Sequence, residues 1–365
     1  MRKLRVGVIF GGRSAEHEVS LLSAKNVLEA LDREKYDPVL IGIDREGRWR
    51  LDDQTRLLFE AARPLPNLTA DSSREVALVA RGDQSRLLDL TDDRELGRLD
   101  VIFPVLHGPY GEDGSVQGLA RLADLPCVGA GILGSAVGMD KDVMKRLLRE
   151  AGVPVARCIV LARSRPVPGF DAVARELGTP VFVKPANLGS SVGIGRPDSE
   201  ESFARAVADA FRFDTKLVVE ERIEGREIEC SVLGNDEPRA SVPGEIVTGG
   251  GHDFYDYRAK YTDENGAQLL IPAPLDAPTT ERIRTLAVRA FQVLCCEGMA
   301  RVDMFLRPSG EVLVNEINTI PGFTRISMYP KLWEASGMSY GELVDKLIAL
   351  AVERHARERG LSTRP

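Results

Sequence analysis

Two apolar stretches near the C-terminal end of the chain carry side chains that could ligate a metal ion. The first, at 301–306, reads Arg-Val-Asp-Met-Phe-Leu, and the second, at 312–318, reads Val-Leu-Val-Asn-Glu-Ile-Asn. The tetrapeptide between them, Arg-Pro-Ser-Gly at 307–310, has the composition of a turn. Together the two stretches therefore predict a β-hairpin.

Three oxygen-bearing side chains would share one face of this hairpin. Asp303 alternates with apolar neighbours, and Glu316 and Asn318 lie two residues apart, so both point to the same side of their strand. Carboxylate and amide oxygens, completed by water and substrate phosphates, suit a hard divalent cation such as Mg²⁺. Solvated acids on an exposed hairpin face are the alternative, but the apolar run before this set argues against it. The pattern indicates phosphate chemistry and calls for a nucleotide site nearby.

Length, composition and charge narrow the class of protein. The chain has 365 residues with 43% hydrophobic and 6% aromatic content, as expected for a globular protein of two or three domains. Its net charge of -7, without a basic run, does not suit a nucleic-acid partner. No apolar stretch is long enough to span a bilayer, and the one at 6–10 is too short for a signal peptide. Five cysteines without CxxC or disulfide spacing fit a cytoplasmic protein.

The N-terminal third predicts an open parallel α/β domain. A buried strand at 6–10 is followed by a Gly-Gly turn and by apolar residues at helical spacing over 21–31. Further apolar strands at 39–43 and 101–105 would complete the sheet. Residues 45–99 have weak periodicity and could hold an insertion of short strands.

The rest of the chain predicts two α+β regions. Strands at 155–161 and 180–184 precede a helix at 200–210, and strands at 216–220 and 226–233 precede a helix at 281–294. The hairpin and a helix at 340–357 complete the chain. The expected domains are 1–138, 139–215 and 216–360, the last with a glycine-hinged loop at 249–268.

A lysine and a small-residue loop could hold phosphate. Lys184 ends an apolar strand, where burial is costly unless an anion meets the ammonium group, and Lys141 offers a second one. The following loop, Gly-Ser-Ser-Val-Gly at 189–193, could bring backbone N–H groups to phosphate oxygens. The loop lacks the Lys-Ser/Thr ending of a Walker A motif, and taken alone a plain turn is its favoured interpretation.

Several other polar residues follow strand ends. Glu16 and His107 do so in the first domain, where open α/β sheets place their sites, although a helix cap and a loop histidine are the alternatives. Glu220 and Glu227 flank a short break that suits an adenine-binding hinge as well as it suits solvated glutamates. The loop at 249–268 holds three tyrosines and a lysine, which favours a lid over substrate rather than a plain surface loop.

Taken together, these motifs resemble the ATP-grasp superfamily and, within it, the D-alanine-D-alanine ligase family of the longer bacterial type. The resemblance runs along nearly the whole chain apart from 45–99. It is carried by the segments at 10–21, 106–114, 139–141, 183–193, 225–229, 254–261, 300–303 and 315–322. It implies an N-terminal open parallel α/β domain followed by a two-part ATP-grasp fold.

The resemblance also implies roles for individual residues. The metal ligands would be Asp303, Glu316 and Asn318, holding two Mg²⁺ or Mn²⁺ ions. The ATP-binding residues would be Lys141, Lys184, Ser191, Glu220, Glu221, Ile223, Glu227, Phe254, Phe305 and Asn315. The catalytic residues would be Glu16, Ser190, Tyr261, Arg301 and Gly322. The substrate-binding residues would be Glu16, His107, Lys260, Arg301, Ser327 and Met328.

The activity implied by the resemblance is the ATP-dependent joining of two D-alanine molecules for peptidoglycan precursor synthesis. One carboxylate would take the γ-phosphoryl group, and the second amine would attack the acyl phosphate, with ADP and phosphate released. The family also implies a homodimer. An acceptor such as D-lactate is the alternative, but ester-forming relatives lack tyrosine at the position of Tyr261. Pro109-Tyr110 departs from the expected pattern and leaves the details of that loop open. A nucleotide-binding protein without catalysis is a third hypothesis, which the complete set of metal-site residues disfavours.

Overall fold

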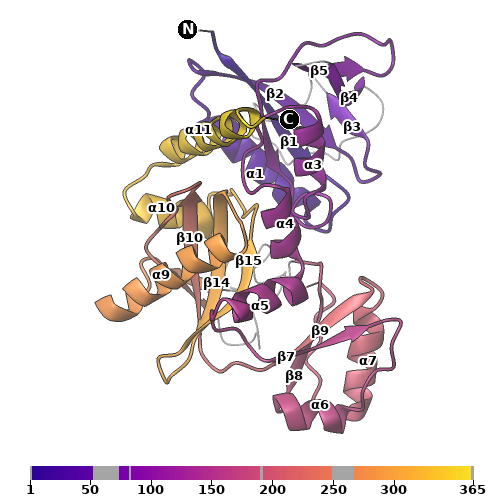
Figure 1. Ribbon diagram of the computed structural model, residues 1–365, viewed down its shortest axis with the longest axis vertical. Helices are drawn as coiled ribbons and strands as arrows, with labels where there is room; N and C mark the ends of the chain where they lie inside the picture. Colours follow the sequence, from indigo (N-terminus) through magenta and orange to yellow (C-terminus); the bar gives the residue numbers. More distant parts are fainter. Residues whose placement is uncertain (1, 52–73, 82–83, 190–191, 249–266, 363–365) are drawn as a thin grey trace.

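The structure, a computed structural model, describes residues 2–51, 74–81, 84–189, 192–248 and 267–362. Over these residues the chain folds into three β-sheets with helices packed against them (Figure 1). Nowhere in the described ranges is a helix both long and apolar enough to cross a membrane.

The first sheet has the strand order β5-β4-β3-β2-β1-β6. Its strands are β1 (Leu4–Gly11), β2 (Tyr36–Ile43), β3 (Trp49–Leu51), β4 (Arg74–Arg81), β5 (Gln84–Asp89) and β6 (Val101–Val105). β1 pairs in parallel with β2 and β6, which confirms the predicted parallel sheet. The uncertain region 45–99 supplies β3, β4 and β5, which pair antiparallel and extend this sheet at one edge.

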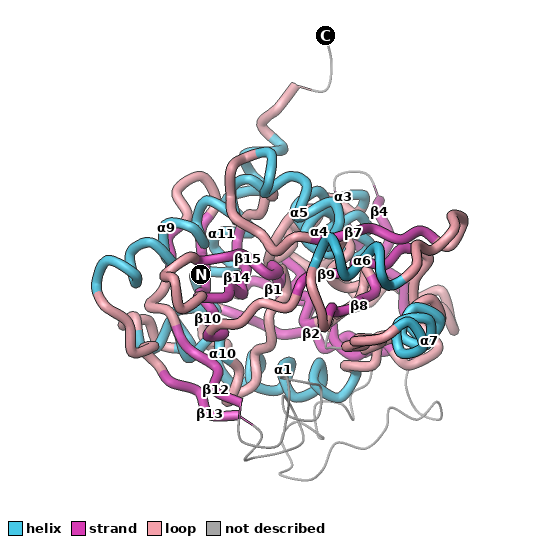
Figure 2. Tube along the Cα trace, turned by 90° about the horizontal axis from the view of Figure 1, so that it is seen from below, coloured by secondary structure: helices cyan, strands magenta, loops and turns pink. Residues whose placement is uncertain are grey.

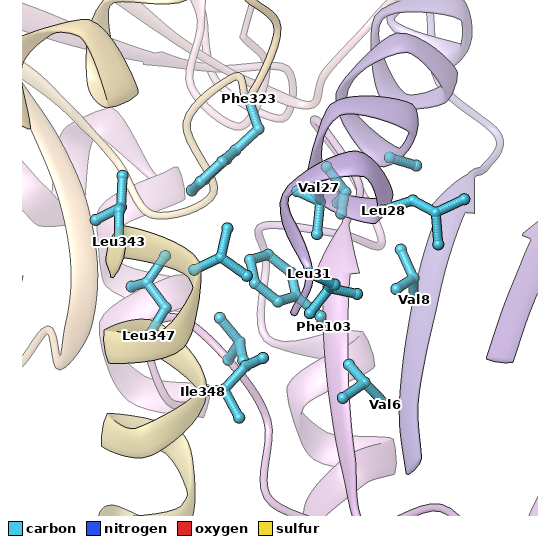
Figure 3. Close-up of a cluster of buried hydrophobic side chains, with 14 of the residues drawn as sticks. Val6, Val8, Val27, Leu28, Leu31, Phe103, Phe323, Leu343, Leu347 and Ile348 are labelled. Atoms are coloured by element: carbon cyan, nitrogen blue, oxygen red, sulfur yellow. The ribbon is translucent and has the colours of Figure 1, made fainter. Parts of the chain in front are cut away.

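Helices cover both faces of the first sheet. They are α1 (His17–Ala30) and α11 (Tyr340–Arg359) on one side and α3 (Ser115–Leu122) on the other. Figure 3 shows Leu343, Leu347 and Ile348 of α11 facing Phe103 of β6, and Leu31 at the end of α1 joins the same cluster. The C-terminal helix therefore closes the core of the N-terminal domain, a contact between the two ends of the chain that local sequence patterns do not reveal.

The second sheet is antiparallel, with the order β7-β9-β8. Its elements are β7 (Cys158–Ala162), α6 (Phe170–Leu177), β8 (Val181–Pro185), α7 (Glu200–Ala210) and β9 (Lys216–Glu221). The predicted strand at 155–161 begins later, at Cys158, because Val155 instead forms an isolated bridge with Val314. Both helices pack on one face of this sheet and form a small apolar core with it.

The third sheet runs β13-β12-β10-β14-β15, with β11 beside β10. Its strands are β10 (Arg226–Gly234), β11 (Arg239–Ala240), β12 (Gly244–Thr248), β13 (Ala267–Leu270), β14 (Gly298–Leu306) and β15 (Val312–Asn318). The remaining helices are α4 (Ile132–Met139), α5 (Lys141–Glu150), α9 (Ala277–Val293) and α10 (Met328–Ala335). Figure 2 shows β10, β14 and β15 of the third sheet next to β8 and β9 of the second sheet. Residues 267 and 268 of the predicted loop belong to β13.

The helix α5 contacts both the second and the third sheet: its Lys145 pairs with Glu220 of β9, and its apolar side packs in the core of the third sheet. It packs with α9 on the third sheet, and Met144 and Leu148 lie in the same buried cluster as Phe291. The side chain of Asp140 caps its N-terminus by accepting hydrogen bonds from the backbone N–H groups of Asp142 and Val143. The helix start therefore fixes the position of the neighbouring Lys141.

Candidate functional site

The predicted hairpin is present and brings the three proposed metal ligands together. β14 and β15 pair antiparallel, with Asp303 opposite Glu316 and Arg301 opposite Asn318. The backbone N–H of Gly310 donates to the carbonyl of Arg307 at 2.9 Å, closing the turn. The amide Nδ2 of Asn318 donates to Oδ2 of Asp303 at 2.9 Å. The oxygen donors of two neighbouring strands therefore lie on one face, as the sequence predicts.

Arg301 covers the carboxylate of Asp303. Its Nε and Nη2 donate to Oδ1 and Oδ2 of Asp303, each at 2.7 Å. Its Nε also lies 2.8 Å from Oε2 of Glu229 on the adjacent strand. On the other side of the hairpin, Nζ of Lys141 lies 3.4 Å from Oε2 of Glu316. Each carboxylate of the hairpin thus faces a basic side chain.

This pairing bears on metal binding. Within the described ranges, no group of three or more His, Cys, Asp and Glu side chains is arranged to hold a metal ion. The set on the hairpin is two carboxylates and one amide, a donor type that suits Mg²⁺ and Mn²⁺. These residues fit such a cation, although a cation bound to Asp303 would have to displace the guanidinium of Arg301.

A cleft of about 480 Å³ lies beside the hairpin, between the second and third sheets. It is lined by all of the predicted ATP-binding residues that the structure describes. These are Lys141, Lys184, Glu220, Glu221, Ile223, Glu227, Phe305 and Asn315, and the cleft also reaches Asp303 and Glu316. The predicted nucleotide residues and two predicted metal ligands therefore share one cavity.

A buried ion-pair network lies in the wall of this cleft. Oε1 of Glu220 lies 2.9 Å from Nζ of Lys145, and Oε2 lies 2.6 Å from Nζ of Lys184. Burial alone would raise the pKa of Glu220, but the two ammonium groups outweigh it and lower the pKa to about 2. Burial likewise lowers the pKa of Lys184, yet the Glu220 carboxylate reverses this, and the net shift is upward. Lys184 is thus held charged where a phosphate would bind.

The carboxylate of Glu221 belongs to the outer side of the hinge. Its Oε2 accepts hydrogen bonds from Nε and Nη2 of Arg157 at 3.0 and 2.8 Å, and Oε1 accepts from the Arg157 backbone N–H at 2.8 Å. Arg307, just past β14, lies 3.6 Å from the same carboxylate. Only the remainder of Glu221 is therefore available to the cleft, which suits recognition of adenine by its backbone.

Glu16 and His107 meet at the carboxyl ends of β1 and β6. Both are buried, and the Oε2 of Glu16 lies within 3.8 Å of where a side chain on Gly108 or Gly189 would begin. Nδ1 of His107 donates to the Ile320 carbonyl at 3.0 Å. Burial lowers the pKa of His107, and Arg301 lowers it further against the opposing carboxylate of Glu16. The imidazole is therefore neutral.

Glu112 anchors the segment that follows β15. It accepts hydrogen bonds from the backbone N–H groups of Gly108 at 2.8 Å and Ile320 at 3.2 Å. Burial and the nearby Glu16 carboxylate raise the pKa of Glu112 to about 8. Phe323 is tied to α1 by Ser23, whose Oγ accepts from its backbone N–H at 3.2 Å. The segment carrying Gly322 is thereby fixed to the N-terminal domain.

Gly322 and Ser327 lie in contact. A side chain at Gly322 would begin 2.8 Å from Oγ of Ser327, so this hydroxyl would have to move to admit one. That Oγ accepts from the backbone N–H of Thr324 at 3.0 Å. The side chain of Met328, predicted to bind substrate, packs instead with Ile246 and Leu332 in a buried cluster. Any contact of Met328 with substrate would therefore use its backbone.

Five predicted site residues lie outside the described residues. They are Ser190, Ser191, Phe254, Lys260 and Tyr261. Their roles stay predictions from the sequence.

No role was predicted from the sequence for three residues of the site: Lys145, Glu112 and Glu229. All three are buried and ionisable. Lys145 pairs with Glu220 and Glu229 pairs with Arg301, both predicted site residues. Glu112 accepts a hydrogen bond from the backbone N–H of Gly108, the neighbour of the predicted His107. Glu229 alternates with Glu227 on an apolar strand, a signal like the one that identified Asp303. Lys145 lies in a helix with many charges, and nothing local distinguishes it from its exposed neighbours.

Two antiparallel sheets that enclose a nucleotide-sized cleft lined by lysines and acids define an ATP-grasp protein. The chain matches the family model described as D-ala D-ala ligase N-terminus over residues 5–130, and that described as D-ala D-ala ligase C-terminus over residues 147–349. The chain belongs to the D-alanine-D-alanine ligase family.

Individual relatives agree over their full length. D-alanine--D-alanine ligase A of Escherichia coli (strain K12) is 53% identical, with 100% of each chain covered. The D-alanine--D-alanine ligase of Oceanobacillus iheyensis is 51% identical over 99% of this chain and 98% of its own. The solved structure of the ligase from Coxiella burnetii has a TM-score of 0.87 and 41% identity, covering 98% of this chain and 97% of that one. VanG D-Ala:D-Ser ligase from Enterococcus faecalis is also similar, with a TM-score of 0.82 and 37% identity over 96% and 100% of the two chains.

Proposed function

We propose that this protein uses ATP to join two D-alanine molecules into D-alanyl-D-alanine, the dipeptide of peptidoglycan precursors. The observation that carries the proposal is the single cleft that joins Lys184 and Glu220 to Asp303 and Glu316, in a chain that matches ligases of this name along its whole length. The ester-forming alternative has no support among these relatives.

The first step requires charge to be offset around the γ-phosphate. Lys184, held charged by Glu220, and Lys141, whose Nζ donates to the Leu188 carbonyl at 2.7 Å, would bind the phosphate oxygens. Asp303, Glu316 and Asn318 would hold Mg²⁺ or Mn²⁺, two ions by analogy with the family. When bound, the metal offsets negative charge on the phosphoryl group being transferred.

In this step an oxygen of the first D-alanine carboxylate bonds to the γ-phosphorus and ADP leaves. Glu16 would bind the ammonium group of that D-alanine, beside the neutral His107. The acyl phosphate is needed because a free carboxylate is a poor electrophile. Its formation therefore makes the carbonyl carbon open to attack.

In the second step the amine nitrogen of the second D-alanine bonds to that carbon, and phosphate leaves as the nitrogen loses a proton. Arg301 and the backbone N–H of Gly322 would stabilise the oxyanion that forms in between. Ser327 and Lys260 would bind the carboxylate of the second D-alanine. Ser190 and Tyr261 would tie the lid to Glu16.

The arrangement in the cell and in solution is proposed on the family alone. We expect a cytoplasmic homodimer that binds neither nucleic acid nor membrane. The division into domains at 1–138, 139–215 and 216–360 also stays a prediction. The helix α11, the last element of the third of these domains, packs on the sheet of the first.

The activity is tested by measuring phosphate release from ATP and Mg²⁺ with D-alanine or L-alanine as the amino acid. We expect release with D-alanine and a dipeptide product by mass spectrometry. D-serine and D-lactate as acceptors, mixed with D-alanine, would measure how strictly a second D-alanine is chosen. Phosphate release with L-alanine but not with D-alanine would contradict the proposal.

A further inference from the structure

Side chains from three neighbouring strands form two rows across the face that carries the proposed metal ligands. In one row, Glu229 of β10 lies opposite Asp303 of β14, which lies opposite Glu316 of β15. In the next row, Arg301 lies between Ser231 and Asn318. Directly opposed side chains on antiparallel strands have Cβ atoms about 5 Å apart, so the three carboxylates form a line.

Arg301 is shared between two of these carboxylates. Its Nε has a single N–H, and this is directed to Asp303 at 2.7 Å, with Nη2 donating to the other oxygen of the same group. Glu229 faces the same nitrogen at 2.8 Å and therefore acts mainly by charge. Glu229 and Asp303 each expose less than a tenth of their surface, so water screens their attraction to Arg301 poorly.

The proposed function gives Asp303 and Arg301 different tasks. Asp303 must turn its oxygens to a cation, and Arg301 must reach the carbonyl oxygen of the substrate. The contact between them serves neither task and has to be broken. Of the two acids beside Asp303 in this row, Glu316 faces Lys141, whereas Glu229 lies 2.8 Å from the guanidinium of Arg301.

We propose that Glu229 is a positioning residue that holds Arg301 in place when a divalent cation takes Asp303. The inference rests on the proposed function. Glu229 draws the guanidinium away from Asp303, which leaves that carboxylate open to the metal, and it keeps the guanidinium beside the reacting carbonyl. It touches neither substrate nor product.

The test uses Glu229→Gln, which keeps the shape of the side chain and removes its charge. Glu245→Gln is the matched control. Glu245 of β12 is as buried as Glu229, and it pairs through two hydrogen bonds of 2.7 Å with Arg226, which lies on the same strand as Glu229. Mn²⁺ binding to the full-length protein, followed by the EPR signal of free Mn²⁺, requires no turnover. Partners of this kind change metal affinity or activity by about 10- to 100-fold.

We expect Glu229→Gln to weaken Mn²⁺ binding about tenfold and to lower kcat by a similar factor with little change in the KM for ATP. Glu245→Gln should change neither. In an Arg301→Ala background, Glu229→Gln should lower kcat no further and should alter Mn²⁺ affinity at most about twofold, because its partner is gone.

The outcomes separate the two proposals. Wild-type Mn²⁺ affinity and kcat in Glu229→Gln would overturn the positioning role and leave the ligase activity untouched. An equal loss of Mn²⁺ affinity with and without Arg301 would make Glu229 a direct metal ligand, which also overturns it. Absence of D-alanine-dependent turnover in the wild type would refute the function, while the Mn²⁺ measurements would still decide whether Glu229 acts through Arg301.

Discussion

Replacing Glu220 with glutamine should destabilise the protein because two buried ammonium groups depend on this carboxylate. Glu220 is 3% exposed, and the side chain of Lys145 is 1% exposed. Lys184 donates to Glu220 from the other side at 2.6 Å. The substitution keeps the shape of residue 220 and removes the charge that both lysines face.

The pKa of Glu220 gives the size of the effect. Burial opposes ionisation, but Lys145 and Lys184 lower the pKa from 4.5 to about 2, which corresponds to about 3 kcal/mol. Because the pKa is lower in the folded state, this stabilisation is fully present above about pH 4.5 and is lost as the pH falls toward about 2. At pH 7 we therefore expect Glu220→Gln to lose about 3 kcal/mol of unfolding free energy, a loss in the range of about 3–5 kcal/mol for breaking a buried ion pair.

Urea unfolding at pH 7, with amide hydrogen exchange of the β7-β9-β8 sheet as a local measure, would test this expectation. Adding Lys145→Met to Glu220→Gln removes one unpaired ammonium group and should recover part of the loss. Equal unfolding of Glu220→Gln and wild type would refute the reasoning. So would a double variant less stable than the single one.

Three further changes test other parts of the site. Because the pKa of Glu112 is raised to about 8 in the folded state, its contribution to stability is lost as the pH rises from about 4.5 to about 8. The urea midpoint of the wild type should fall over this range, and Glu112→Gln should remove that fall. The same pH dependence of the midpoint in the variant and the wild type would contradict this expectation. Arg157→Ala removes the hydrogen bonds that hold the carboxylate of Glu221, so the KM for ATP should rise by about 2- to 10-fold at nearly constant kcat. A loss confined to kcat would show that Arg157 does not position Glu221 for ATP binding. Tyr261→Phe, argued from the sequence alone, should admit D-lactate as acceptor, detected as ester by mass spectrometry; exclusive dipeptide formation would show that role to be wrong.

The hairpin of β14 and β15 could be predicted from the sequence because its information is local. Alternation places Asp303, and a spacing of two places Glu316 and Asn318, so the turn at 307–310 suffices to bring them together. The nucleotide cleft is less local. Lys184 could be recognised as costly to bury, but the carboxylate that holds it charged comes from another strand of its sheet.

Other contacts could not be predicted because they join elements far apart in the chain. Lys145 of α5 pairs in the interior with Glu220 of β9, and the buried Glu112 accepts a hydrogen bond from Ile320, more than 200 residues away in the chain. The sequence allowed short strands at 45–99 but could not place them, for a different reason. Their apolar alternation is weak, and only pairing with β2 and with one another defines them.

One continuous backbone connects the two halves of the proposed reaction. β15 carries Glu316 and Asn318 on the phosphate side, and within two residues the chain reaches Ile320, which hydrogen-bonds to both His107 and Glu112. Two residues further lies Gly322. Because both ends of this short segment are held by buried hydrogen bonds, the distance between the proposed metal ligands and the proposed oxyanion donor is set by backbone length. In the proposed reaction, the placement of the reacting carbonyl relative to the phosphate would therefore be set by this hydrogen-bonded segment.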